Sequence, residues 1–68
     1  MQMYNFDLMK KGTNEPLETI NNMMRSLDEA KNRCKNLLAG RAPMIGADRI
    51  QLRENGGAAI IFSWPEDA

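Results

Sequence analysis

The chain has 68 residues and equal numbers of basic and acidic side chains, nine of each, so its formal net charge is zero. This length allows one small domain, and the balanced charge argues against a protein that its overall field draws to nucleic acid or to an anionic membrane. With one cysteine and no histidine, the chain cannot form an internal disulfide or a zinc site built from Cys and His ligands.

The first predicted element is a strand at residues 3–10. Tyr4, Phe6 and Leu8 alternate with Asn, Asp and Met residues. This is the pattern of a strand with one buried, aromatic face.

A short edge strand at residues 17–20 and a loop at residues 21–25 are predicted next, after turn-forming residues that include Gly12. A second interpretation of this region stays open. Apolar residues at helical spacing also fit one long helix from about residue 16 to residue 39, although Thr and Asn residues in it are poor helix formers. The apolar residues concerned are Leu17, Ile20, Met24 and Leu27.

The main helix is predicted at residues 26–39. Ser26 is a good N-cap, and Glu29 three residues later completes a capping box. Gly40 can adopt the left-handed conformation that ends a helix. A single apolar stripe predicts that one side of the helix is buried. The stripe consists of Leu27, Ala30, Cys34, Leu37 and Leu38.

Residues 41–47 predict a connection rather than a helix. Pro43 favours an extended conformation for Ala42, the residue before it. Met44 and Ile45 are apolar for a loop, so we expect them to close one end of the core.

Two strands, at residues 48–54 and 58–64, are predicted near the end of the chain, and residues 55–57, Asn-Gly-Gly, are a strong hairpin signal between them. We expect a three-residue loop, because this register gathers the large apolar side chains on one face. It pairs Leu52 with Ile60 and Ile50 with Phe62. Pro65 ends the last strand, and residues 66–68 predict a solvated tail.

Together these elements predict an α+β fold, a ββαββ two-layer sandwich with a mostly antiparallel four-stranded sheet and one helix on one face. The favoured strand order is 2-1-3-4, because it keeps all neighbouring strands antiparallel. The predicted core consists of Tyr4, Phe6, Leu8, Leu27, Ala30, Cys34, Leu37, Leu38, Ile50, Leu52, Ile60 and Phe62.

Three features of this pattern resemble a family of short bacterial proteins of unknown function. They are the aromatic first strand, the helix that opens with Ser-Leu-Asp-Glu-Ala at residues 26–30, and a closing hairpin. In that hairpin, a strand like residues 49–53 precedes a glycine turn and a strand ending in a large apolar residue such as Phe62. The likeness covers almost the whole chain. It implies the same ββαββ fold, and it implies no activity, cofactor or site.

No pattern in the sequence predicts catalysis, a cofactor or a metal site. Without histidine, the chain lacks the side chain that ordinarily titrates near neutral pH. Cys34 lies in the apolar stripe of the helix, where a thiol acts as a small hydrophobic group. The six methionines fit a gap-filling role in a small core better than a copper(I) site. We therefore expect a protein that is not an enzyme.

A cytoplasmic location is expected, because an unpaired cysteine is ordinary in a reducing compartment. The N-terminal residues lack the basic and then apolar pattern of a signal peptide, and no apolar run approaches the ~20 residues of a membrane span. We expect no contact with a membrane.

The expected function is that of a small interaction module, which forms a homodimer or docks on another protein through the sheet face away from the helix. One helix covers one face only, and a small domain buries little surface alone. The apolar side chains expected on the other face are Met3, Met9, Ala59 and Ile61. The competing geometry is edge pairing along residues 58–62, which carry no charge.

The alternative function is that of a weak nucleic-acid-binding accessory protein. Lys31, Arg33 and Lys35 give the predicted helix a basic face that could follow a phosphate backbone. The simpler interpretation of the same residues is a solvated helix face.

Overall fold

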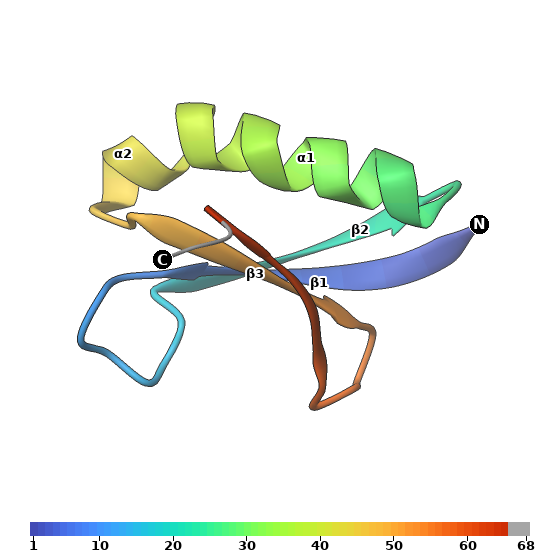
Figure 1. Ribbon diagram of the computed structural model, residues 1–68, viewed down its shortest axis with the longest axis horizontal. Helices are drawn as coiled ribbons and strands as arrows, with labels where there is room; N and C mark the ends of the chain where they lie inside the picture. The colour runs from blue at the N-terminus through green and yellow to red at the C-terminus, as the bar shows by residue number, and fades with distance from the viewer. Residues whose placement is uncertain (66–68) are drawn as a thin grey trace.

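The computed structural model describes residues 1–65 and shows one four-stranded sheet with one long helix lying across it (Figure 1). The strand order is β2-β1-β3-β4, and every neighbouring pair is antiparallel. The predicted α+β fold class and strand order are therefore confirmed. The predicted tail at 66–68 lies outside the described residues. The elements are β1 (Gln2–Met9), β2 (Glu18–Met24), α1 (Leu27–Gly40), α2 (Ala42–Ile45), β3 (Arg49–Glu54) and β4 (Ile60–Trp64).

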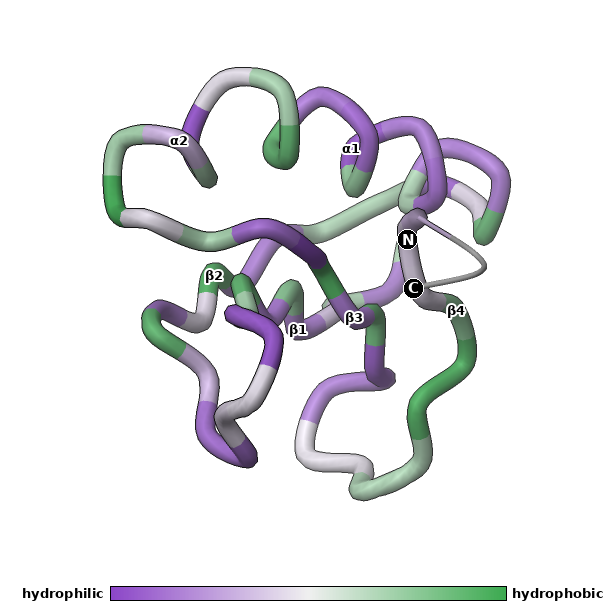
Figure 2. The backbone as a smooth tube through the Cα atoms, turned by 60° about the vertical axis from the view of Figure 1, so that its left-hand side comes forward, coloured by the Kyte–Doolittle hydropathy of each residue, from purple (hydrophilic) through white to green (hydrophobic). Residues whose placement is uncertain are grey.

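The core lies between α1 and the two middle strands. Side chains along β1 alternate between the two faces of the sheet, and its aromatic and leucine side chains lie on the face toward the helix. Phe6 lies opposite Leu52 and Leu8 lies opposite Ile50, and all four side chains are completely buried. Figure 2 shows that α1 is hydrophobic where it faces the sheet and hydrophilic on its outer turns. The confirmed core residues are Tyr4, Phe6, Leu8, Ala30, Cys34, Leu37, Ile50 and Leu52.

Four of the predicted core residues are not fully buried. Leu27 is exposed because it is the first residue of α1, and Ile60 is 51% exposed because of its register in β4. Leu38 and Phe62 are partly buried against the core. Ala42, which the sequence analysis placed in a loop, is buried within the core.

The register predicted for the hairpin is wrong. Leu52 lies opposite Phe62 and Ile50 lies opposite Trp64, while Ile60 and Ile61 together oppose Arg53. The turn itself ends at Gly57, whose N–H donates to Glu54 O at 2.8 Å, but β4 begins only at Ile60 and carries a bulge. The shift of two residues keeps Phe62 and Trp64 on the helix side, where both pack against the core, and the bulge moves Ile60 out of it.

The strand predicted at 17–20 is longer, and the loop predicted at 21–25 is mostly strand. Seven consecutive residues, Glu18 to Met24, pair with Leu8 to Gln2 of β1. Pairing with a buried strand outweighs the low strand preference of Asn21 and Asn22. This strand also excludes the alternative of one long helix starting near residue 16.

The helix ends within one residue of the predicted position, but the left-handed conformation predicted for Gly40 is wrong. Gly40 is helical, and Arg41 keeps right-handed helical angles with φ −88° before the short α2 begins. Pro43 fits the first turn of α2, where its missing N–H costs no hydrogen bond. The left-handed residue is Gly46, with φ 81°. Ile45 packs against the core as expected, but Met44 is 75% exposed and does not close it.

The fully buried Leu52 gives a test of this core. Replacing it with Ala should lower the free energy of unfolding by about 2–5 kcal/mol, because it removes buried methyl groups and leaves a cavity. A domain of this size has a total stability of roughly 3–10 kcal/mol, so the urea midpoint should fall steeply. Met44→Ala is the matched control and should leave the midpoint nearly unchanged. An equal loss in both variants would contradict the assigned core.

Candidate interaction groove between β2 and α1

The two edges of the sheet, β2 and β4, differ in how they are protected. β4 is short and carries a bulge at Ile60 and Ile61, which is a common way to discourage pairing with another chain. β2 is paired with β1 without interruption, and its residues 19–24 contain neither a charged residue nor proline. The outer edge of β2 is therefore the unprotected edge of the sheet.

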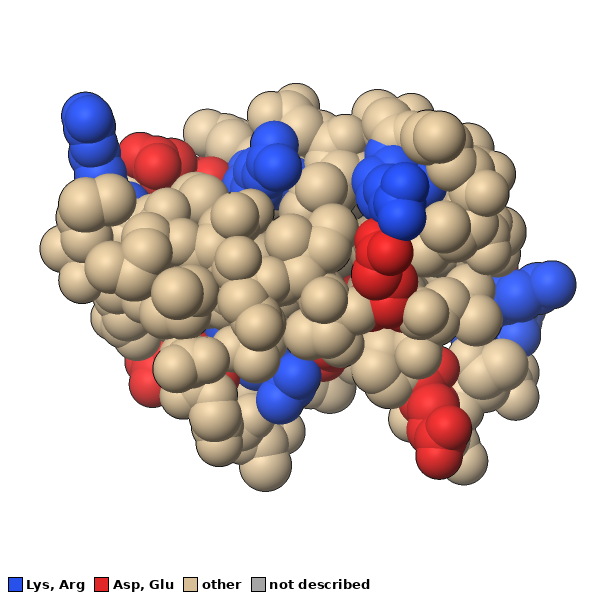
Figure 3. Space-filling model, turned by 180° about the vertical axis from the view of Figure 1, so that it is seen from behind, with Lys and Arg blue, Asp and Glu red and all other residues tan. Residues whose placement is uncertain are grey.

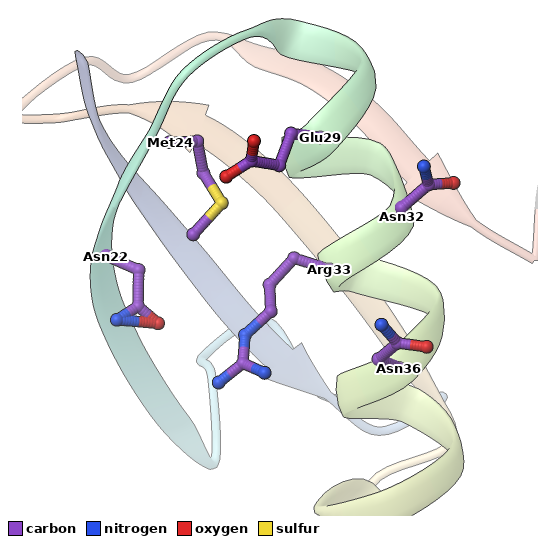
Figure 4. A pocket seen from close by; sticks show the side chains of 6 residues that line it. All are labelled: Asn22, Met24, Glu29, Asn32, Arg33 and Asn36. Atoms are coloured by element: carbon purple, nitrogen blue, oxygen red, sulfur yellow. The ribbon is translucent and has the colours of Figure 1, made fainter. Parts of the chain in front are cut away.

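A groove runs beside this edge, between β2 and α1 (Figure 4). It forms because α1 packs most extensively on β3 and only lightly on β2. Its volume is about 400 Å³. The lining residues come from both elements: Asn22, Met24, Glu29, Asn32, Arg33 and Asn36.

Beyond both ends of the groove, β2 and α1 are held together. At one end, the chain passes directly from β2 into the helix, and Ser26 Oγ accepts a hydrogen bond from Glu29 N–H at 3.2 Å. At the other end, Arg41 donates two hydrogen bonds to the Glu18 carboxylate, at 2.8 and 2.7 Å. Two parallel N–H···O bonds fix the geometry of such a pair. The width of the groove is therefore set at both ends.

Charge on the groove wall comes from Glu29 and Arg33, one helical turn apart on α1. Figure 4 shows both side chains on the flank of the helix that faces β2, with Glu29 near Met24 and the Arg33 guanidinium directed toward Asn22. Among the described residues, neither takes part in an ion pair. The predicted capping box is also only half formed, because no described hydrogen bond runs from Ser26 N–H to the Glu29 carboxylate. Both charges are available to a ligand.

An amide oxygen in the groove lacks a partner. Asn22 Oδ1 is buried and accepts no hydrogen bond from residues 1–65. The same is true of Asn5 Oδ1 on the other face of the sheet. A buried acceptor without a donor costs about 1–3 kcal/mol.

The three basic residues proposed for nucleic-acid contact do not lie together. Lys31 Nζ lies 5.4 Å from the ring centroid of Phe62, and Lys35 Nζ lies 4.4 Å from that of Trp64. These two lysines cover the aromatic side chains of β4, whereas Arg33 lines the groove on the opposite flank of α1. From behind the molecule, basic and acidic side chains alternate with neutral surface and form no continuous patch of one sign among the described residues (Figure 3).

The sheet face away from α1 has a polar centre. Arg53 donates to both carboxylate oxygens of Asp7, at 2.6 and 3.0 Å, and to Gly57 O at 2.8 Å. Thr19 Oγ1 donates to the same carboxylate at 2.7 Å. The hydrogen bond to Asp7 raises the pKa of Arg53. Asp7 is a buried residue, so the middle of this face is a fixed ion pair and not an apolar surface.

The four residues proposed as an interface on that face have different environments. Met9 is already buried, at 7% exposed, and Met3 is half-buried. Ala59 lies in the loop before β4, and only Ile61 is an exposed apolar strand residue of the four. The loops at 10–17 and 55–59 both bend to this side of the sheet and flank it (Figures 1 and 2). The structure does not join the four into one apolar patch.

Comparison with known protein families, curated proteins and solved structures found no match for this chain. Among residues 1–65, no three His, Cys, Asp or Glu side chains come together to hold a metal ion. No helix of the described residues is long and apolar enough to cross a membrane.

The Arg41–Glu18 pair, which links β2 to the residue after α1, predicts a pH dependence of stability. The hydrogen bond from Arg41 lowers the pKa of Glu18 below its ordinary value of 4.5. The pair therefore stabilises the fold above about pH 4.5 and loses this effect as the pH falls through the lower pKa of the folded state. Glu18→Gln should be less stable than the parent at pH 7 in urea titrations, and the difference should shrink as the pH falls below 4.5. Glu15→Gln, in the preceding loop, is the control; an effect of equal size there would contradict the assignment.

Cys34 gives a second test, because its thiol is completely buried. Burial raises the pKa of the Cys34 thiol to about 11, so at pH 8 only about one thiol in a thousand is ionised. A disulfide reagent at pH 8 should modify the native protein at least about a hundredfold more slowly than the urea-unfolded chain. Comparable rates in the two states would show that the thiol is accessible.

Proposed function

We propose that this protein is a non-enzymatic interaction module that binds an extended segment of another protein as an additional strand on β2. The observation that supports this is the unprotected edge of β2 directly beside the groove under α1. In strand addition, backbone hydrogen bonds along the edge supply affinity, and pockets for alternate side chains supply specificity. β2 and its groove offer both.

The two faces of β2 would contact alternate side chains of the added segment. On the side of α1, every second side chain would lie over the groove. On the other side, the intervening side chains would meet Thr19, Asn21 and Met23, of which Met23 is 47% exposed. Contacts on both faces would fix the register of the segment.

A second copy of the chain is a weaker candidate for the same edge. The side chains that β2 itself turns toward the helix side are Glu18, Ile20, Asn22 and Met24. Glu18 is already engaged by Arg41, and the other three are neutral. The β2 strand of a second copy would therefore bring no free charge to Glu29 or Arg33, so we favour another protein. The free thiol of Cys34 favours the reducing cytoplasm as its location.

Amide hydrogen exchange tests the proposal directly. In a free edge strand, N–H groups alternate between those bonded to the neighbour and those open to solvent. Residues of β2 should therefore alternate between slow and fast exchange in the free protein. Extended peptides selected from a random display library should protect the fast amides of β2.

Selected peptides that perturb only the other sheet face would overturn the proposal. Protection of β2 without peptide, together with a dimeric solution mass, would show instead that a second copy occupies the edge.

Neighbouring proline variants give a prediction with an internal control. Of Asn21 and Asn22, one N–H group points to β1 and the other points to the free edge. Proline should destabilise the fold at the residue whose N–H points to β1. It should be tolerated at the residue whose N–H points to the free edge, since an edge strand accepts proline where its N–H faces solvent. The tolerated variant should bind selected peptides at least about tenfold more weakly. Ile61→Lys on β4 should leave binding unchanged; tight binding by the tolerated proline variant would contradict strand addition.

A further inference from the structure

We infer that the groove selects a segment with a basic and an acidic side chain two residues apart, the basic residue first. This inference rests on the proposed strand addition to β2. It assigns the basic side chain to Glu29 and the acidic side chain to Arg33. Both of these helix residues line the groove, and neither takes part in an ion pair among the described residues.

The spacing of the two charges on α1 matches that of a strand. Glu29 and Arg33 are four residues apart, which is about 6 Å along a helix that rises 1.5 Å per residue. Side chains on one face of a strand are two residues apart, or about 6.6–6.8 Å. Neighbouring side chains on the helix side of an added strand would therefore meet the two charges one to one. The residue between them would point to the opposite face of the sheet.

The direction of the added strand sets the order of the two charges. Glu29 lies beside Met24, at the end of β2, whereas the Arg33 guanidinium is directed toward Asn22, two residues earlier (Figure 4). All neighbouring strands of the sheet are antiparallel, and antiparallel pairs are the more stable and more common kind. A segment antiparallel to β2 passes Glu29 before Arg33. Its sequence is therefore basic–x–acidic from N to C.

Met24, a neutral residue of the groove, also suits a segment with this charge order. Met24 offers an apolar contact for the methylene groups of a lysine or arginine side chain. A wholly apolar segment would leave both charges unpaired, which costs affinity.

Three synthetic peptides of nine residues test the inference. They share a Thr- and Val-rich sequence and carry Lys-x-Glu, Glu-x-Lys or Gln-x-Gln at the centre. The Lys-x-Glu peptide should bind about three- to tenfold more tightly than the other two at low salt, as two partly exposed ion pairs allow. The advantage should shrink in 0.5 M salt, because salt screens exposed charges. Calorimetry gives the affinities, and hydrogen exchange at β2 shows where each peptide binds.

A charge exchange on the protein supplies the decisive comparison. The double variant Glu29→Arg with Arg33→Glu should reverse the preference, so that the Glu-x-Lys peptide binds more tightly. The matched control, Lys11→Glu with Glu15→Arg in the loop between β1 and β2, exchanges the same charges away from the groove. It should keep the preference for Lys-x-Glu.

The outcomes separate the two proposals. If all three peptides protect β2 with equal affinity, or if the parent prefers Glu-x-Lys, strand addition stands and the charge order inferred here is overturned. If none of the peptides protects β2, both strand addition and the charge order are overturned.

Discussion

One helix has to cover a sheet that is wider than itself. Four strands spaced by about 4.8 Å span roughly 14 Å between the outer strand axes, whereas a helix with its side chains is about 10–12 Å across. The 14 residues of α1 settle over the middle of the sheet, where Phe6, Leu8, Ile50 and Leu52 are completely buried. The helix side of each outer strand, β2 and β4, is then incompletely covered by α1. The chain covers this surface differently at the two strands.

The two flanks of α1 differ in how completely side chains fill the space between the helix and the outer strand. On the β4 side, Lys31 and Lys35 lie over Phe62 and Trp64, whose rings stack at 6.4 Å. Long lysine side chains cover aromatic surface while their ammonium groups stay in water, so this flank is closed. On the β2 side, Ile20 packs against the core and Arg41 holds Glu18, but the groove beside Asn22 and Met24 stays open. The asymmetry favours β2 as the side at which a partner binds.

The sequence was sufficient for the fold because its signals were local. The alternation of Tyr4, Phe6 and Leu8 and the apolar stripe of the helix identified the layers, and the requirement for antiparallel neighbours gave the strand order. The groove was missed because it depends on β2 reaching Met24. Glu18, Ile20, Asn22 and Met24 do alternate with their neighbours, but asparagine weakens a strand signal that only pairing with β1 restores. The bulge in β4 was missed because nothing in its apolar sequence marks the shift in register.

The position of β1 in the middle of the sheet has a consequence for synthesis of the chain. β1 is synthesised before the other three strands of its sheet, yet its second neighbour, β3, pairs through residues as late as Glu54. Until then, one row of its backbone N–H and C=O groups has no strand beside it, and its aromatic face is covered only in part. A nascent chain with an open strand edge and apolar surface is prone to aggregate. The core therefore cannot close until β3 has been synthesised, more than forty residues after β1 begins.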